Sequence, residues 1–248
     1  MQPEDLLELF AETTRVVRAA VAGVDTSQRR ARTDVPGQYA IDLVADAAAL
    51  EVLHSVPVAV VSEESGRTGD ADAPVTVVVD PIDGSTNCSR GLPYWAISLC
   101  AVDADGALAA TVVNQATMVA TTAVRGRGAW RDGAPISASQ VERIEDSVVL
   151  LEAWPVRKLR WKQFRALGSA ALGLCDVAAG VVDGYVDANG LHKPWDYLGG
   201  LLACREAGAA ITDLGGRPLD VVDPAERRQI LAAGTGPLLA CLREAVEG

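Results

Sequence analysis

The spacing of apolar residues predicts helices near the N-terminus. In residues 4–22, apolar positions such as Leu6 and Phe10 recur at helical spacing among charged residues, which is typical of an amphipathic helix. The polar, basic segment 26–37 predicts a loop or arm. We expect a second helix to begin near Asp46, because the following residues are mostly alanine and leucine.

Buried strands are predicted after these helices. The runs at 58–61 and 75–79 are rich in β-branched residues and bounded by polar ones. Between residues 95 and 124, two turn segments divide three apolar runs, which is the pattern of antiparallel strands joined by turns. The first half of the chain is therefore expected to place helices on a meandering sheet, an α+β arrangement.

Beyond about residue 135 the pattern changes to short strands alternating with helices, which favours an α/β second half. We place the division between an N-terminal domain, 1–138, and a C-terminal domain, 139–248. The second half is expected to contain strands at 148–151, 185–187 and 230–232 and helices at 169–179, 195–206 and 237–246.

Composition narrows the classes of function. The chain has 22 Lys and Arg against 33 Asp and Glu, so its formal charge is 22 − 33 = −11. This balance disfavours binding to nucleic acid or to an anionic membrane surface. No apolar run is long enough to span a membrane, and the N-terminus carries acids where a secretory signal carries basic residues, so we expect a cytoplasmic protein. The five widely spaced cysteines are expected to be buried thiols.

The most informative segment is the turn that follows the apolar run 75–79. Asp80 and Asp83 both come at the end of this predicted buried strand. Two carboxylates that meet in a buried place require a cation to remain ionised, and a hard metal with oxygen ligands suits them. The carbonyl oxygen of Ile82 lies between them in sequence and provides a further candidate ligand.

Gly84 and Ser85 follow at once and are expected to begin a helix. The unpaired N–H groups of a helix N-terminus bind anions, so this turn predicts a phosphate site beside the metal.

Two more acids are candidates for the same site. Glu63 follows the strand 58–61, and Asp196 lies in the first turn of the predicted helix 195–206. Taken alone, an acid placed like Glu63 is more often part of a solvated turn than a metal ligand, and one placed like Asp196 is more often a helix cap. Each is a weak indication by itself.

Together, these motifs resemble the inositol monophosphatase family of magnesium-dependent, lithium-inhibited phosphatases. The likeness spans residues 6–246. It implies a layered αβαβα sandwich of the sugar-phosphatase type and a homodimer. The motifs that carry it are Ser62-Glu63-Glu64-Ser65, Asp80-Pro81-Ile82-Asp83-Gly84-Ser85-Thr86-Asn87, Gly168-Ser169-Ala170-Ala171 and Pro194-Trp195-Asp196.

The resemblance also implies roles for these residues. Glu63, Asp80 and the carbonyl of Ile82 would hold a first Mg²⁺, and Asp80, Asp83 and Asp196 a second. A third, weaker ion would share Glu63. Two or three ions per site are therefore expected.

The attacking water would be oriented or deprotonated by Glu63 with the hydroxyl of Ser85. In the family an upstream acid pairs with that hydroxyl, and Asp46 is the expected match, with a plain helix cap as the alternative. The phosphate would contact Asp83, Gly84 and Ser85.

The remaining substrate contacts would come from Gly168, Ser169 and Ala170, unless these small residues serve only close helix–sheet packing. Asp187 would bind a sugar hydroxyl, or else simply end a strand.

The expected function is Mg²⁺-dependent hydrolysis of a small phosphorylated metabolite, inositol monophosphate or a related polyol or sugar phosphate. The alternatives are histidinol phosphate, fructose 1,6-bisphosphate or a 3′-phosphoadenosine nucleotide as substrate, or a non-catalytic protein that binds metal and phosphate.

Overall fold

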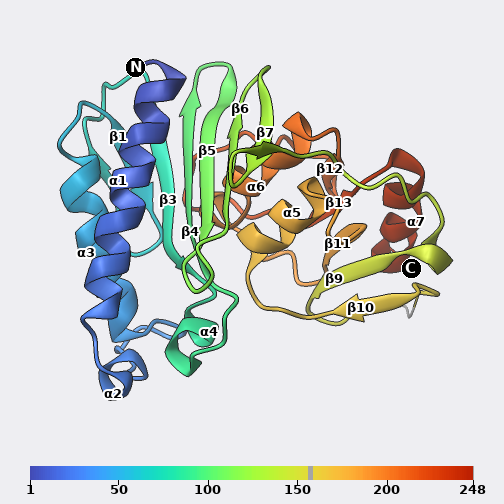
Figure 1. Ribbon diagram of the computed structural model, residues 1–248, viewed down its shortest axis with the longest axis horizontal. Helices are drawn as coiled ribbons and strands as arrows, with labels where there is room; N and C mark the ends of the chain where they lie inside the picture. Colours follow the sequence, from blue (N-terminus) through green and yellow to red (C-terminus); the bar gives the residue numbers. More distant parts are fainter. Residues whose placement is uncertain (156–158, 248) are drawn as a thin grey trace.

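The computed structural model describes residues 1–155 and 159–247, which form two sheets and three layers of helices (Figure 1). The larger sheet has the strand order β2-β1-β3-β4-β5-β6-β7-β8, and the smaller has the order β10-β9-β11-β13-β12. The helices are α1 (Pro3–Ala22), α2 (Thr26–Arg29), α3 (Ala40–Leu53), α4 (Ser85–Arg90), α5 (Ala170–Ala178), α6 (Pro194–Glu206) and α7 (Gly236–Glu247), with a 3₁₀ turn at Ile144–Asp146.

The strands of the larger sheet are β1 (Ala59–Ser62), β2 (Gly66–Gly69), β3 (Thr76–Asp83), β4 (Ala96–Asp103), β5 (Gly106–Asn114), β6 (Ala120–Val124), β7 (Gly128–Arg131) and β8 (Ala134–Pro135). Those of the smaller sheet are β9 (Val148–Glu152), β10 (Gln163–Arg165), β11 (Gly184–Asp187), β12 (Ala210–Asp213) and β13 (Ile230–Ala233). In the larger sheet only β1 and β3 pair in parallel.

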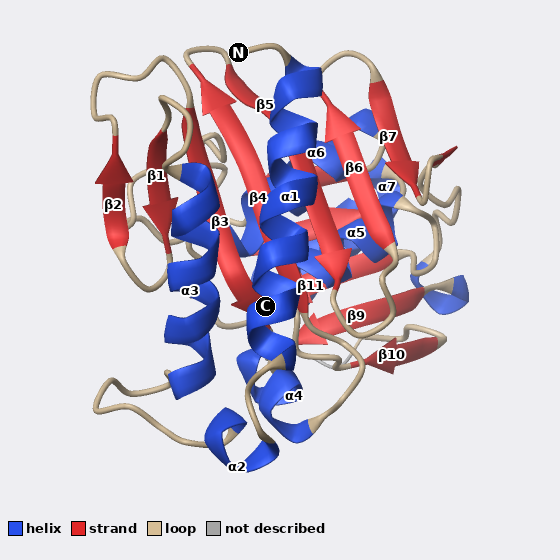
Figure 2. Cartoon of the chain, turned by 60° about the vertical axis from the view of Figure 1, so that its left-hand side comes forward, coloured by secondary structure: helices blue, strands red, loops and turns tan. Residues whose placement is uncertain are grey.

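Three apolar clusters show how the layers are held together. Helices α1 and α3 cover one face of the larger sheet, as Figure 2 shows, and bury Phe10 and Ile41 against it. Helices α5 and α6 lie between the two sheets, where Leu174 and Leu198 are buried. Helix α7 packs on the outer face of the smaller sheet through Leu238. The order of layers is therefore αβαβα, as predicted.

Strand β3 is apolar throughout because both of its faces are covered. Val77 and Val79 pack in the cluster under α1 and α3, whereas Val78 belongs to the cluster that contains α5 and α6. A strand buried on both faces loses the alternation of apolar and polar residues that marks a half-exposed one.

The structure confirms most predicted elements and corrects two. The three apolar runs between residues 95 and 124 are the antiparallel strands β4, β5 and β6. The second helix, however, begins at Ala40 and not near Asp46. The segment 26–37 contains the short helix α2, whose first turn is capped by the carboxylate of Asp25.

The division into two domains at 138/139 remains a prediction. The two sheets lie on either side of it, yet α5 and α6 from the second half share one core with the larger sheet. All five cysteines are unpaired thiols, and four of them are buried. Within the described ranges, no helix combines the length and the apolar character needed to cross a bilayer.

Candidate metal and phosphate site

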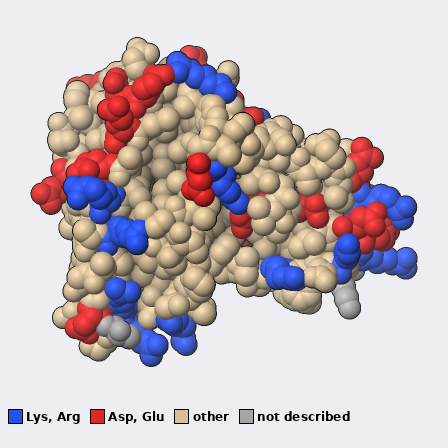
Figure 3. Space-filling view, viewed as in Figure 1, with Lys and Arg blue, Asp and Glu red and all other residues tan. Residues whose placement is uncertain are grey.

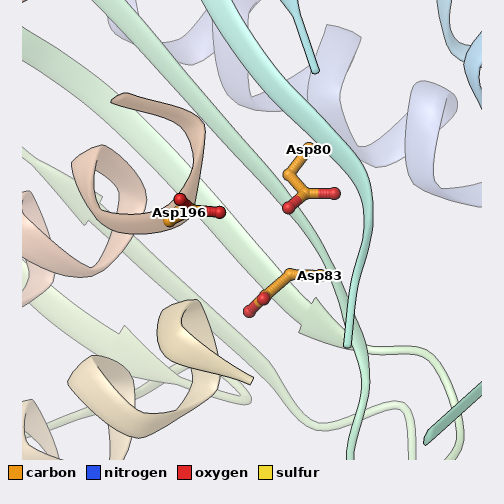
Figure 4. A group of neighbouring side chains, drawn as sticks. All are labelled: Asp80, Asp83 and Asp196. Atoms are coloured by element: carbon orange, nitrogen blue, oxygen red, sulfur yellow. The ribbon is translucent and has the colours of Figure 1, made fainter. Parts of the chain in front are cut away.

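Three aspartates from distant parts of the chain converge between the larger sheet and α6. Carboxylate oxygens of Asp80, Asp83 and Asp196 all lie within 4.8 Å of one another, and the three side chains face a common space in Figure 4. Asp80 and Asp83 come from the end of β3, and Asp196 comes from the first turn of α6.

A bulge in β3 explains how two residues three positions apart share one face. Asp80 pairs with Ser98 of β4 and Asp83 pairs with Ala96, so β3 contains one residue more than its partner across this stretch. Side chains three apart on a regular strand point to opposite faces, and one extra residue restores them to the same face. The irregular end of β3 therefore creates the carboxylate pair.

The first turn of α6 fixes the third carboxylate. Pro194 occupies the first turn of the helix, and Asp196 accepts a hydrogen bond on Oδ2 from the backbone N–H of Lys193 at 2.6 Å. Asp196 is thus the third residue of the helix and caps it from inside. The cap orients the carboxylate and does not exclude a role as a ligand.

Asp83 is held by the start of α5. Its carboxylate accepts hydrogen bonds from the Ser169 hydroxyl at 2.6 Å, from the Ala171 N–H at 2.8 Å and from the Ala170 N–H at 3.3 Å. Asp80 accepts one from the N–H of Ile82 at 2.9 Å. Both carboxylates are therefore fixed before any ligand binds.

The protein supplies too little positive charge to offset the negative charges of these buried carboxylates. Burial and the charges of Glu63 and its neighbours raise the pKa of Asp80 well above its usual range. Burial, with the charge of Asp196, raises the pKa of Asp83 to about 7, although the hydrogen bond from Ser169 opposes this rise. A divalent cation would offset both effects, and an all-carboxylate donor set suits a hard ion.

Glu63 lies at the edge of this group. It follows β1, and its side chain is exposed within a pocket of about 360 Å³ that Asp196 and Ser85 also line. Loss of hydration inside the pocket, with the negative charge of Asp196, raises the pKa of the Glu63 carboxyl. Glu63 therefore experiences the charge of the aspartates while remaining accessible to solvent.

A second pocket, of about 290 Å³, lies next to the first. Asp196 lines both, and Asp83, Gly168, Ala170 and Asp187 line the second. Asp187 is fully buried, and its Oδ1 accepts hydrogen bonds from the N–H groups of two following residues, Asn189 and Gly190.

The other predicted residues lie around the same turn. Ser85 begins α4, and Gly84 before it has a φ of 90°, in the left-handed region. A side chain at Gly84 would place its Cβ 2.9 Å from the carbonyl oxygen of Gly168, so the two motifs are in close contact. Ser169 is buried, and its hydroxyl is engaged by Asp83.

The proposed pairing of Asp46 with Ser85 is wrong in this structure. Asp46 lies in the middle of α3, one turn further along than expected, and its carboxylate accepts hydrogen bonds from the hydroxyls of Ser62 and Ser65. Asp42, one helical turn earlier, lines the same pocket as Glu63 and Ser85. It accepts a hydrogen bond from the N–H of Tyr39 at 2.8 Å, and burial raises its pKa to about 7.

Sequence reasoning gave too little weight to Asp42 and to His192. His192 lines the second pocket, and its Nε2 lies 2.7 Å from the hydroxyl of Tyr185. Its Nδ1 lies 3.7 Å from Oδ2 of Asp196. Burial lowers the pKa of His192, but the negative charges of Asp196, Asp187 and Glu152 outweigh burial and raise it to about 9. Its position four residues before Asp196 was the available signal.

Comparisons with known proteins agree with this geometry. The model of the inositol monophosphatase family matches residues 10–247. A fructose-1,6-bisphosphatase/inositol-1-monophosphatase of Archaeoglobus fulgidus is 34% identical over 94% of this chain and 95% of its own length. The Nus factor SuhB of Vibrio cholerae is 36% identical over 63% of each chain.

Among solved structures, a Pyrococcus horikoshii protein described as similar to inositol-1 monophosphatase superposes with a TM-score of 0.84 at 25% identity. It covers 99% of this chain and 98% of its own. The match thus extends over both sheets and includes every acid of the site. The chain belongs to the inositol monophosphatase family, whose members are phosphatases.

Proposed function

We propose that this protein hydrolyses a small phosphomonoester with the help of Mg²⁺, and that its substrate is inositol monophosphate or a related polyol or sugar phosphate. The observation that carries the proposal is the convergence of Asp80, Asp83 and Asp196 beside the first turn of α4. Carboxylates for a cation and N–H groups for a phosphate are thereby placed together.

We assign the candidate ligands to two principal ion positions. Asp80, Asp83 and Asp196, whose carboxylate oxygens lie together, would hold one ion. The family resemblance implies that Glu63, Asp80 and the carbonyl of Ile82 would hold another. A third, weaker position would again use Glu63. Bound Mg²⁺ would neutralise phosphate charge and lower the pKa of a coordinated water.

The chain's own groups would handle the proton and orient the reactants. Glu63 is accessible from the pocket, and its carboxylate, once ionised beside a bound cation, would orient or deprotonate the attacking water. Ser85 would orient that water, with Asp42 in the supporting position first assigned to Asp46. One oxygen of Asp42 is buried without a hydrogen-bond partner among the described residues, which leaves it available to the Ser85 hydroxyl.

The second pocket supports a polyol leaving group. Asp187 has one buried oxygen, Oδ2, without a hydrogen-bond partner in the described part of the chain. Such an oxygen accepts a hydroxyl hydrogen bond well, because leaving it unpaired is costly. Gly168 and Ala170 line the same pocket and leave room for a sugar ring.

The direct test is phosphate release from a panel of substrates, measured with Mg²⁺ and with EDTA. The panel contains inositol 1-phosphate, fructose 1,6-bisphosphate, histidinol phosphate and a 3′-phosphoadenosine nucleotide. We expect Mg²⁺-dependent release with the polyol phosphates fastest. Activity that persists in EDTA would contradict the metal mechanism, and no release from any substrate would favour a binding protein without turnover.

Three further properties complete the proposal. Inhibition by lithium and a homodimeric state are expected from the family resemblance, and a cytoplasmic location is expected from the acidic N-terminal segment. Dose–response curves for Li⁺ and sedimentation of the purified protein test the first two.

A further inference from the structure

A separate basic pocket lies on the other side of Tyr39 from the acidic site. Its volume is about 160 Å³, and it is lined by Arg30, Arg32, Tyr39, Ser89 and Arg90. Figure 3 shows blue groups together at the lower left, over the region where Figure 1 places α2 and α4. At about 30 Å³ for each water, the pocket has room for a compact anion.

The positive charge of this pocket is not neutralised by direct ion pairs among the described residues, although Arg32 acts on Asp42 at longer range. Within residues 1–155 and 159–247, none of Arg30, Arg32 and Arg90 forms an ion pair with Asp or Glu. Elsewhere arginines do pair, as Arg125 does with Asp103. Three guanidinium groups around one cavity repel each other, which is an unexpected arrangement in a chain with a net charge of −11.

Local contacts hold two of the arginines in place. The guanidinium of Arg32 lies 3.8 Å from the ring centre of Tyr39 and donates to its hydroxyl at 2.8 Å and to the carbonyl of Gly37 at 3.1 Å. Arg30 donates through Nε to the carbonyl of Ser89 at 3.3 Å. This single bond caps the C-terminal end of α4. The terminal N–H groups of Arg30 remain available to a ligand.

The hydroxyl of Tyr39 is acted on by both hydrogen bonds and the arginines of the pocket. Hydrogen bonds from Thr86 and Ser89, with the charges of Arg32 and Arg90, lower the pKa of its hydroxyl below the usual range. The ring itself is buried, so the wall it forms is rigid.

We propose that Arg30, Arg32 and Arg90 form a binding site for a compact oxyanion, either inorganic phosphate or sulfate or the phosphoryl group of a metabolite. Fixed guanidinium groups suit tetrahedral oxyanions because they present several N–H donors in one plane. The site needs no metal, which separates it from the acidic pockets.

The position of Tyr39 gives this site a physical link to the proposed active site. Its hydroxyl lies 3.3 Å from the hydroxyl of Thr86, the neighbour of Ser85. Its N–H bonds to Asp42 in the acidic pocket. The oxyanion site does not depend on the proposed catalytic function, since it uses different side chains.

Calorimetric titration of inorganic phosphate into EDTA-treated protein tests the proposal. Without metal, the acidic site repels anions, so binding reports the arginines alone. We expect measurable binding that weakens at least about tenfold in Arg90→Gln and Arg32→Gln and is largely retained in Arg90→Lys. Arg18→Gln, which removes an exposed arginine of α1 from outside the pocket, should bind like the unaltered protein.

Two outcomes would overturn the site: no binding of phosphate at millimolar concentration, or equal affinity in Arg90→Gln, Arg32→Gln and the unaltered protein. The same titration with sulfate and with a sugar phosphate separates the two sources of oxyanion. Equal affinity for all three assigns the site to a free ion, and a clear preference for the sugar phosphate assigns it to a metabolite. Absence of phosphatase activity would leave this result unaffected.

Discussion

Asp83 is the residue on which most of the site's contacts converge. It belongs to the aspartate cluster, is fixed by α5 and lies in the pocket that Asp187 also lines. We expect Asp83→Asn to reduce kcat by roughly a thousandfold or more, because the substitution removes a charge that a bound cation requires. Phosphate release under saturating Mg²⁺ measures it.

The control for this variant is Asp72→Asn, a loss of the same charge at an exposed position outside both acidic pockets. It should retain full turnover. A thermal unfolding midpoint of Asp83→Asn close to that of the unaltered protein would show that the fold is intact, and near-normal turnover would remove Asp83 from the mechanism.

Substitutions of Asp42 and Asp46 should have different effects, one on turnover and one on stability, although the two residues lie one helical turn apart. Asp42→Asn should lower kcat by roughly tenfold to a hundredfold, because Asp42 shares a pocket with Glu63 and Ser85. Asp46→Asn should instead lower the free energy of unfolding by about 1–3 kcal/mol, since two hydroxyls lose a charged acceptor. Parallel kinetics and urea titrations of both variants distinguish them, and the reverse pattern would restore Asp46 to the active site.

Ser169 should act on the site through Asp83. Ser169→Ala removes the 2.6 Å hydrogen bond to the carboxylate, so we expect a severalfold rise in the Mg²⁺ concentration needed for half-maximal rate. The matched control is Ser55→Ala, an exposed serine just after α3 whose hydroxyl donates a hydrogen bond to the backbone carbonyl of Val52. An unchanged Mg²⁺ requirement in Ser169→Ala would limit this hydroxyl to capping α5.

The sequence allowed prediction of site residues wherever chemistry is concentrated in a short motif. Asp80, Asp83 and Asp196 could be named because each follows or begins a clear element. Asp46 was misplaced because α3 lacks the usual Ser, Thr or Asp at its N-cap. Tyr39 occupies that position, and Asp42 caps the helix from its first turn, so the true start of α3 carries no strong signal in the sequence.

At the level of elements, the turn from β3 to α4 depends on one glycine. Gly84→Ala should lower the free energy of unfolding by about 1–3 kcal/mol, because the φ of 90° is strained for alanine and the added Cβ meets the Gly168 carbonyl. We also expect weaker Mg²⁺ activation, since the turn positions Asp83. Gly126→Ala, also at positive φ but with open space around it, separates backbone strain from this contact. Equal losses in the two variants would show that the contact is unimportant.

Element prediction succeeded for buried strands and failed for short edge strands. β3 to β5 are long and apolar, so their sequences identify them. β2, β10 and β12 are three or four residues long and mostly exposed or half-buried, and each is defined by its hydrogen bonds to one neighbouring strand. The bulge in β3 was likewise invisible, because it is defined by pairing with β4.

For the molecule as a whole, the free energy of unfolding of the metal-free protein should fall as the pH rises, and Mg²⁺ should diminish or invert this dependence. The pKa of Asp83, raised to about 7, and the raised pKa of Asp80 mean that the folded, metal-free protein binds more protons than the unfolded chain. The resulting stabilisation is complete below about pH 4 and is lost as pH rises through 7. We therefore expect the metal-free protein to be less stable at pH 8 than at pH 5.5.

Urea unfolding in EDTA at the two pH values measures this difference. Saturating Mg²⁺ should diminish or invert it, because the ion binds the ionised carboxylates of the folded state. A metal-free stability that rises between pH 5.5 and 8 would show that these acids are already compensated within the protein.

Helix α6 belongs by sequence to the second half of the chain but packs on the first sheet, where it supplies Asp196. During synthesis, β3 emerges more than a hundred residues before this helix. Asp80 and Asp83 therefore remain without the third carboxylate until α6 has been synthesised. A nascent chain that stops before residue 194 lacks a complete cation site, so strong metal loading and the associated gain in stability should begin only after the last layers have assembled.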